Sequence, residues 1–304
     1  MSFYLGIDGG GTKTRCALGD ETRVLATAVT GGSNVVRHGE AQARVALHEG
    51  ICEVCGAANI SPQQIHRICV GAAGAARPAV VSAIRNILAE LTPAPVQVVG
   101  DTVTTLEAAF GSGPGIVTIA GTGSIVYGRD AAGHVARAGG WGFAISDEGS
   151  GQWIGRQAVS AILQAHDAGV ETTLTDGVFK EWNLTSLDAL VQAANSTPPP
   201  EFPRLFPIVL RASDAGDAVA RSLLETAAAH LVRLTAMVIR RLVPRPPHAP
   251  IATSGSVFRQ SALVREVFYN TLQGTFSGLE LRRELVEPVD GALALARRGA
   301  TESG

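Results

Sequence analysis

The sequence predicts an α/β fold built from two similar halves, on three observations. Each half opens with a short apolar strand that ends in a turn rich in glycine and hydroxyl residues, at residues 3–14 and 115–124. Each turn leads into further short strands and then into helical segments, which is a weak internal repeat. The chain has 304 residues, and single hydrophobic cores usually stop growing at about 250–300 residues, so two domains are expected.

The first half is predicted to contain three meander strands followed by alternating helices and strands. Its strands are short apolar runs bounded by turn residues, and its helices have apolar residues at every third or fourth position. The expected strands are residues 3–7, 14–18, 23–29, 65–71 and 96–100, and the expected helices are residues 40–57 and 78–91.

The second half repeats this order and then becomes helical. A proline-rich stretch, residues 195–203, is expected to be an irregular surface connection. The expected strands are residues 115–120, 125–127, 134–137 and, as the last strand, 250–253, and the expected helices include residues 217–242, one that starts at 256, and 288–298. We expect this last helix to pack back on the first half. The predicted domains are residues 1–112 with 287–304, and residues 113–286.

Composition excludes several classes of partner. The formal net charge is −2 and charged residues make up 17% of the chain, so there is no basic excess to bind nucleic acid or an anionic membrane. The N-terminus lacks the basic segment of a signal peptide, and no uninterrupted apolar run reaches the roughly 18 residues of a membrane span. A cytoplasmic protein is expected.

The four cysteines, Cys16, Cys52, Cys55 and Cys69, lie in the first quarter of the chain without the paired spacing of a zinc site. Cys52 and Cys55 form a C-x-x-C pattern inside a predicted helix, where positions three apart share a face. We favour a buried structural pair over a redox or metal role. Reduced cysteines agree with a cytoplasmic location.

The first glycine turn has the composition of a phosphate-binding loop. Glycines allow backbone N–H groups to approach phosphate oxygens, and hydroxyl and lysine side chains add donors. Asp8, at the end of the strand, could hold Mg²⁺ through water. The pattern is neither a Walker A loop nor a dinucleotide fingerprint, and a plain hairpin turn is the alternative. The predicted ligands are Asp8, Gly10, Gly11, Thr12, Lys13 and Thr14.

Two further glycine segments follow in the second half. Gly121, Thr122, Gly123 and Ser124 repeat the chemistry of the first turn at the equivalent place. Two such turns predict a clamp that holds a polyphosphate from both sides. Gly255 and Ser256 lie between a strand and a helix, where a nucleoside could approach the backbone and the helix N-terminus.

The order of these three segments resembles that of the actin/hexokinase/Hsp70 ATPase superfamily. Within it, the chain is similar over nearly its whole length to the N-acetylglucosamine kinase branch of the BadF/BadG/BcrA/BcrD family. The more specific marks are GGSN at 31–34, VVGDT at 98–102 and GGWGFAISDEGSGQWIGRQA at 139–158. The resemblance implies two ribonuclease H-like (actin-like ATPase) domains with an interdomain cleft.

The resemblance also implies a reaction, the transfer of a phosphoryl group from ATP with Mg²⁺ to the 6-hydroxyl group of an amino sugar. Asp101 matches the family's catalytic base, which would accept the proton of that hydroxyl group. The alternative is that Asp101 caps the helix expected at residues 103–109.

The resemblance assigns sugar binding to Asn34, Asp101, Gly140, Trp141 and Asp147. Amide and carboxylate groups suit vicinal hydroxyl groups, and Trp141 between glycines offers an apolar wall for a sugar face, with a core aromatic as the alternative. The neighbouring Glu148 is left outside the site, because it could instead cap a helix that begins near Gly149.

One loop departs from the family pattern and leaves the substrate open. Residues 71–77, GAAGAAR, offer only backbone donors and methyl groups where animal relatives carry hydroxyl side chains near the 2-substituent of the sugar. N-acetylglucosamine, glucosamine and N-acetylmuramate therefore all stay as expected substrates.

Other functions of related proteins fit the sequence less well. ATP-driven activators of acyl-CoA dehydratases hold an iron–sulfur cluster through cysteines of the second domain region, whereas all four cysteines here precede residue 70. The zinc-binding cysteines of ROK kinases are also missing. A non-enzymatic sensor or an actin-like filament is the third class, and the presence of Asp8, Asp101 and both turns favours an enzyme. The resemblance implies a homodimer.

Overall fold

The computed structural model describes residues 2–242 and 249–299. The chain forms two compact units: the residues up to Gly113 together with those from Val286 onward, and Pro114–Leu285. We call these unit 1 and unit 2. The domain limits predicted from the sequence stay a prediction, and residues 1, 243–248 and 300–304 within them lie outside the described residues.

The two units contain sheets of the same topology. Each has five strands, in the order β3-β2-β1-β4-β5 in unit 1 and β8-β7-β6-β9-β10 in unit 2. In both, three antiparallel meander strands are followed by two parallel strands added beside the first. The strands are β1 Phe3–Gly9, β2 Lys13–Gly19, β3 Val24–Gly31, β4 Ile65–Ala72, β5 Val96–Val99, β6 Gly115–Ala120, β7 Ser124–Arg129, β8 Val135–Gly139, β9 Pro250–Ser254 and β10 Glu280–Leu285. The predicted duplicated α/β fold is therefore confirmed.

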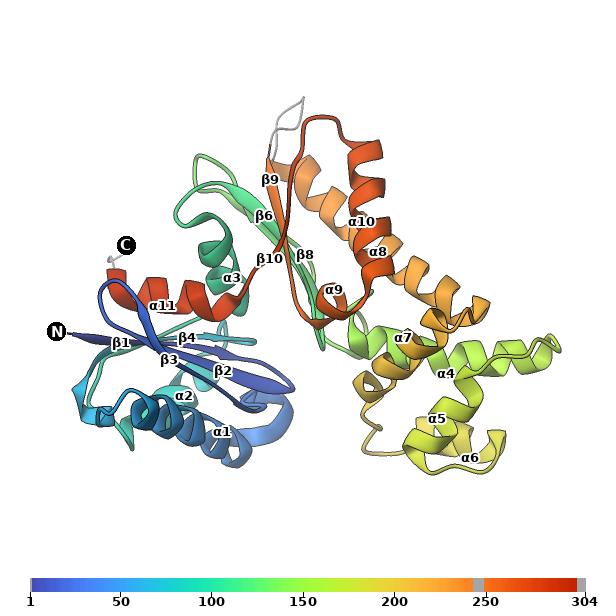
Figure 1. Cartoon of the computed structure of the whole chain (residues 1–304), viewed down its shortest axis with the longest axis horizontal. Coiled ribbons are helices and arrows are strands. Elements are labelled where there is room, and N and C mark those ends of the chain that lie inside the picture. Colours follow the sequence, from blue (N-terminus) through green and yellow to red (C-terminus); the bar gives the residue numbers. More distant parts are fainter. Residues whose placement is uncertain (1, 243–248, 300–304) are drawn as a thin grey trace. The chain divides into compact units, whose positions relative to one another are not determined.

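Helices cover both faces of the sheet in unit 1 (Figure 1). Leu5 and Ile7 of β1 are buried in one core with α1 (Val35–Ala57) and α2 (Pro78–Ala89). Gly6, which points to the opposite face, lies so close to α11 (Pro288–Arg298) that a Cβ atom there would be 2.3 Å from the backbone nitrogen of Leu293. On this face α11 also contacts α3 (Asp101–Phe110). Among its described residues, unit 1 also contains the short 3-10 helix η1, Pro62–Gln64.

The first helix corrects the prediction for the C-x-x-C cysteines. Within α1, Cys55 is buried but Cys52 is exposed. Positions three apart on an α-helix differ by about 60° around the axis, which is enough to place one inside and one outside the core. The two cysteines are therefore not a buried pair. The helix also begins earlier than the expected residue 40, because a first helical turn from Val35 precedes a kink at Gly39, whose φ is 77°.

Unit 2 is larger because helices fill the connection between its third and fourth strands. One long helix, α1, and the short η1 make that connection in unit 1, whereas the described residues of the connection in unit 2 form five α-helices and η2. The helices of unit 2 are α4 Gly151–Asp167, α5 Leu174–Trp182, α6 Leu187–Ala194, η2 Phe202–Leu205, α7 Phe206–Asp214, α8 Ala218–Leu242, α9 Ser256–Gln260 and α10 Ala262–Thr275. Their apolar faces form one core with β6, β7, β8 and β9.

Within the described residues, α8 is the helix that is long and apolar enough to cross a membrane by length and composition. The same helix passes through the core of unit 2, where Leu224, Leu231 and Val238 are at most 1% exposed. Core helices of globular proteins meet this test as readily as membrane spans do. We therefore assign α8 to the core.

The sequence prediction that residues 250–253 form the last strand is wrong. Strand β10 follows it and pairs with β9 in parallel. Its sequence, ELRREL, carries four charged residues and is mostly exposed, as an edge strand permits. Short apolar runs were the basis of the strand predictions, and β10 has none.

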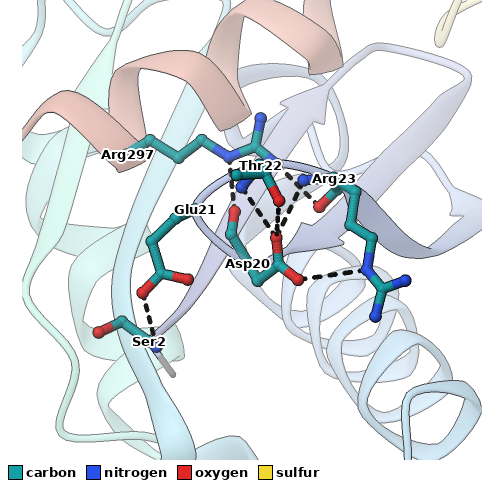
Figure 2. A network of polar contacts seen from close by, with 6 residues as sticks. All are labelled: Ser2, Asp20, Glu21, Thr22, Arg23 and Arg297. Atoms are coloured by element: carbon teal, nitrogen blue, oxygen red, sulfur yellow. Dashed lines mark hydrogen bonds and ion pairs between the residues drawn. The ribbon is translucent and has the colours of Figure 1, made fainter.

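The C-terminal helix is tied to the β2–β3 turn of unit 1, as Figure 2 shows. The Arg297 guanidinium donates to the carbonyl oxygens of Asp20 and Arg23, at 2.8 Å each. The Asp20 carboxylate accepts hydrogen bonds from the backbone N–H groups of Thr22 and Arg23. These bonds hold the pKa of Asp20 well below its usual range. The turn therefore gives α11 a fixed anchor at the far end of β2.

Candidate functional site

The first glycine turn is a tight hairpin between β1 and β2 that residues 31–33 support. The Gly10 N–H donates to the Lys13 carbonyl oxygen at 3.1 Å and closes the turn. The Ser33 N–H donates to the Gly10 carbonyl oxygen at 3.2 Å, and a Cβ on Gly9 would lie 2.9 Å from the Ser33 Oγ. The GGSN segment therefore packs against the outside of the turn. Because a Cβ atom on Gly9 would collide with Ser33, packing inside the protein by itself requires a glycine there.

The predicted phosphate ligands of this turn differ in exposure. Thr12 and Lys13 are exposed, whereas Thr14 is fully buried. The Thr14 hydroxyl lies 2.7 Å from both the Gly31 carbonyl oxygen and the Ser33 Oγ. Its role as a ligand stays a prediction, and its position is that of a hydroxyl group that fixes the turn.

Two aspartates lie at the carboxyl edge of the unit 1 sheet. Strands β1, β4 and β5 are parallel neighbours, so their carboxyl ends meet at one edge. Asp8 of β1 lies opposite Gly71 of β4, and Gly71 lies opposite Val99 of β5. Asp101 follows Val99 by two residues. Surrounding protein desolvates Asp8 although it keeps some exposure, and this raises its pKa to about 7, with the Asp101 charge as the next cause. Burial also raises the pKa of Asp101, against the effect of a hydrogen bond from the Thr102 N–H.

Helix α3 positions Asp101 as its first residue. The N-cap position is occupied by Gly100, so the alternative that Asp101 is the N-cap is wrong. The Thr104 and Thr105 hydroxyls donate to the Asp101 carbonyl oxygen, at 2.9 and 2.7 Å. A Cβ on Gly71 would lie only 2.5 Å from the Thr104 Oγ1. Gly71 thus allows the first turn of α3 to rest against β4.

Asn34 is the N-cap of α1. Its Oδ1 accepts hydrogen bonds from the N–H groups of Val36 and Arg37, at 3.0 and 3.1 Å. The Nδ2 group is the part of this amide that could donate to a sugar hydroxyl. The loop at residues 71–77 comes close to the same helix start, since a Cβ on Gly74 would lie 3.2 Å from a methyl group of Val36.

The second glycine turn, in unit 2, is supported by a helix N-terminus. The Gly121 N–H donates to the Gly123 carbonyl oxygen at 2.9 Å. The first two N–H groups of α4, from Gly151 and Gln152, donate to the carbonyl oxygens of Gly121 and Thr122, at 2.8 and 3.1 Å. Helix N-termini leave such donors free, and here the turn satisfies them.

Asp147 lies beside this turn in a left-handed conformation. Its φ is 66°, its side chain is 8% exposed, and a Cβ on Gly123 would lie 3.0 Å from its carboxylate. A non-glycine residue with positive φ is uncommon and often marks a functional site. Glycine at 123 leaves the space in which the Asp147 carboxylate sits.

Glu148 does not cap α4. That helix begins at Gly151, and its N-cap is Ser150, whose Oγ accepts from the Trp153 N–H at 3.1 Å. Glu148 instead pairs with Arg233 of α8 at 3.7 Å, and its carbonyl oxygen accepts from the buried Ser124 hydroxyl at 2.8 Å. It therefore links the loop of Asp147 to the second turn.

The third glycine segment meets the second turn within unit 2. Gly255 has φ 104°, and a Cβ there would lie 2.3 Å from the Ala120 carbonyl oxygen and 2.9 Å from the Gly121 N. It directly precedes α9, whose first residue is Ser256. Parallel pairing of β6 and β9 explains why these sequence-distant glycines meet at one sheet edge.

Trp141 is a surface residue, so its alternative as a core aromatic is wrong. Its side chain is 68% exposed. Gly140, before it, has φ 68°, and a Cβ on Gly140 would lie 2.6 Å from the Ile125 side chain. The Arg137 guanidinium stacks over the indole at 4.1 Å from the ring centroid.

Sequence reasoning noted GGSN at 31–34 and the loop at 71–77, but it missed how their residues hold these groups in place. Gly71 and Thr104 position Asp101, and Ser33 supports the first turn. These supporting contacts carry no local signal, because each joins segments that are distant in the sequence. The predicted residues also include one carboxylate suited to magnesium. Mg²⁺ bound with nucleotides usually takes one or two carboxylates, phosphates and waters, so Asp8 fits this ion. The described residues hold no cluster of three or more metal-ligating side chains.

Comparisons with known proteins agree with these observations. The sequence profile of the BadF/BadG/BcrA/BcrD ATPase family matches residues 5–296. The N-acetylmuramic acid/N-acetylglucosamine kinase of Clostridium acetobutylicum is 30% identical over 302 residues, which cover 98% of this chain and 99% of that protein. A solved structure of a candidate N-acetylglucosamine kinase from Chromobacterium violaceum is 26% identical, with a TM-score of 0.77 and coverage of 97% and 98%.

A more distant structure shows the fold alone. A ROK family glucokinase from Streptomyces griseus, solved with glucose and AMPPNP, is 16% identical, with a TM-score of 0.59 and coverage of 98% of this chain and 100% of that chain. The two repeated sheets are therefore those of the actin-like ATPase fold, which ROK kinases share.

Proposed function

Because the chain belongs to the BadF/BadG/BcrA/BcrD ATPase family, we propose that it is an ATP-dependent kinase that phosphorylates the 6-hydroxyl group of N-acetylglucosamine or a related amino sugar. Glucosamine and N-acetylmuramate are the related substrates. The observation that carries the proposal is the placement of Asp8 and Asp101 at one sheet edge. Phosphoryl transfer needs an acceptor for the hydroxyl proton and a negative group to hold a cation.

Asp101 is the proposed general base. Burial raises its pKa, so its ionised form is a stronger base than an exposed aspartate would be. Its Oδ1 accepts a hydrogen bond from the Thr102 N–H, which leaves Oδ2 for the sugar hydroxyl. The rigid first turn of α3, supported by Thr104 over Gly71, limits how far the carboxylate can move.

ATP binding is proposed for the three glycine segments. The first turn would contribute Gly10, Gly11, Thr12, Lys13 and Thr14; the second Gly121, Thr122, Gly123 and Ser124; and the third Gly255 and Ser256. Exposed Thr12 and Lys13 support direct contact with phosphate oxygens. Asp8 would hold Mg²⁺ through water, and the bound ion would neutralise charge on the phosphates. Close backbone packing at Gly9, Gly10 and Gly255 supports preformed turns.

Sugar binding is proposed for Asn34, Gly140, Trp141 and Asp147, together with Asp101. Asn34 would donate through Nδ2, since its Oδ1 caps α1. Asp147 would accept from hydroxyl groups, and its fixed left-handed backbone supports a preorganised acceptor. The clostridial relative is named for two of the candidate sugars. A cytoplasmic location and a homodimer remain predictions.

The direct experiment measures ADP release with MgATP and a panel of hexosamines. We expect N-acetylglucosamine, glucosamine or N-acetylmuramate to stimulate ADP release strongly over the rate with ATP alone, and mass spectrometry to find the 6-phosphate. Mannitol and glycerol are the matched controls for a non-specific alcohol acceptor. The proposal would be abandoned if no amino sugar raised the rate above these controls.

A further inference from the structure

The loop after β8 presents a large aromatic side chain outward. Trp141 is 68% exposed, and Phe143 and Ile145 of the same loop are 54% and 82% exposed. Scattered exposed apolar residues are normal, but three within five residues form a patch. The loop ends at the buried Asp147, so the patch and a fixed carboxylate belong to one segment.

Arg137, on β8, organises the start of this loop. Its Nη2 donates to the carbonyl oxygens of Gly139 and Gly140, at 3.1 and 3.2 Å, and its guanidinium lies 4.1 Å from the Trp141 ring centroid. The main chain of Arg137 is held in turn, because its carbonyl oxygen accepts from Arg241 at 2.9 Å. Across the described part of the chain, no carboxylate pairs with Arg137, so its charge is directed to carbonyl oxygens and the indole.

The backbone of the loop is fixed at both ends of the patch. Gly139 and Gly140 have φ angles of 73° and 68°, and Gly140 packs against Ile125 without room for a Cβ atom. The Ser146 N–H donates to the Gly142 carbonyl oxygen at 2.9 Å, which closes the loop one residue before Asp147. Trp141 therefore lies between two fixed turns. One is Gly139–Gly140, whose carbonyl oxygens both accept from Arg137, and the other is closed by the hydrogen bond from Ser146 to Gly142.

We propose that Arg137 is a positioning residue that holds the Trp141 indole as the stacking surface for the sugar ring. This rests on the proposed function. The guanidinium covers one face of the indole and leaves the other for the C–H face of a pyranose. Aromatic rings fixed in this way offer apolar contact at little loss of conformational entropy. Arg137 itself does not touch the sugar, and it acts through the two glycine carbonyl groups and the ring.

The test compares Arg137→Met, Arg137→Lys and a matched control, Arg221→Met, in steady-state kinetics. Arg221 is an exposed arginine of the same unit that pairs with Glu225 on α8. Loss of a cation–π contact and of the two hydrogen bonds should raise the sugar KM of Arg137→Met about five- to tenfold. The kcat and the KM for ATP should stay within about twofold of the wild type. Arg137→Lys keeps the charge but loses the planar guanidinium group. Its sugar KM should therefore lie between those of the wild type and Arg137→Met.

A second readout is acrylamide quenching of tryptophan fluorescence, to which Trp141 is the most accessible of the three tryptophans, since Trp153 is buried and Trp182 half-buried. Freed from the guanidinium, Trp141 should be quenched more strongly in Arg137→Met than in Arg221→Met, and saturating sugar should protect it in the wild type. The inference would be overturned if Arg137→Met left the sugar KM or the quenching unchanged. It would also be overturned if the sugar KM, the ATP KM and kcat all changed by the same factor. A wild type without amino-sugar turnover would refute the proposed function, while the quenching comparison would still report on the Arg137 contact.

Discussion

The two glycine turns of this protein have equivalent places in equivalent sheets, yet they are held in different ways. The turn of unit 1 is supported by the side chain and backbone of Ser33, and the sheet edge beside it carries Asp8 and Asp101 with raised pKa values. The turn of unit 2 is supported by the N-terminus of α4 and by Gly255. We propose that one supersecondary unit thus serves two tasks: unit 1 would supply proton and cation chemistry, and unit 2 a rigid backbone frame.

A large effect is expected where unit 1 holds the proposed base, Asp101. Gly71→Val would place a side chain on the Thr104 Oγ1, which a Cβ atom alone would approach to 2.5 Å. We expect α3 to be displaced, the free energy of unfolding to fall by about 1–3 kcal/mol, and kcat to fall with it. Chemical denaturation and steady-state kinetics measure both. Gly56→Val in α1, where a Cβ meets nothing within 4 Å, is the control for adding the same residue. Normal kcat in Gly71→Val would contradict this account of Asp101.

A smaller effect should separate two glycines within the second turn. A Cβ on Gly123 would press on the Asp147 carboxylate at 3.0 Å, whereas one on Gly121 would meet nothing within 4 Å. Gly123→Ala should therefore raise the KM for the sugar several-fold, about 1 kcal/mol of binding free energy. Gly121→Ala should leave the sugar KM nearly unchanged. Equal sugar KM values in the two variants would show that the Gly123–Asp147 contact does not matter.

The glycine turns could be predicted from the sequence because their signal is local. A short apolar strand followed by glycine and hydroxyl residues marks both turns. Strands β4 and β6 were found from their apolar runs, and α2 from its helical periodicity. The sequence marked Gly255, the GGSN segment and the loop at 71–77, but not the packing contacts of Ser33, Gly71 and Gly255, because those contacts join segments distant in the sequence. Strand β10 was missed for a physical reason: as an exposed edge strand it needs no apolar face.

The pH dependence should distinguish the chemistry of unit 1. Asp101 must be ionised to accept a proton, and burial raises its pKa. The kcat/KM at saturating MgATP should therefore fall on the acid side at a pH clearly above the ordinary aspartate value of about 3.9. The kcat/KM of Gly121→Ala should fall at the same acidic pH as that of the wild type. A profile that stays flat down to the pH of an ordinary carboxyl group would contradict a buried base.

The smallest effect concerns stability far from either turn. Hydrogen bonds hold the pKa of Asp20 below its unfolded value, so its stabilising effect is present above the unfolded pKa and is lost as pH falls through the folded one. Asp20→Asn should lower the Tm slightly at neutral pH, and the difference from wild type should shrink below about pH 4. Thermal melts at several pH values measure this, with kcat expected to be unchanged. A Tm difference that stayed constant with pH would exclude the charge as the cause.

The contrast between the two turns depends most on Asp101, and one substitution measured in two ways tests it. A raised pKa means that folding disfavours the ionised carboxylate, so at pH 7 Asp101→Asn should keep or raise the Tm. The same variant should lose about 10²- to 10⁴-fold in kcat with the preferred amino sugar, the usual contribution of a general base. Stable folding with lost turnover is the predicted result, and turnover at the wild-type rate would contradict the account.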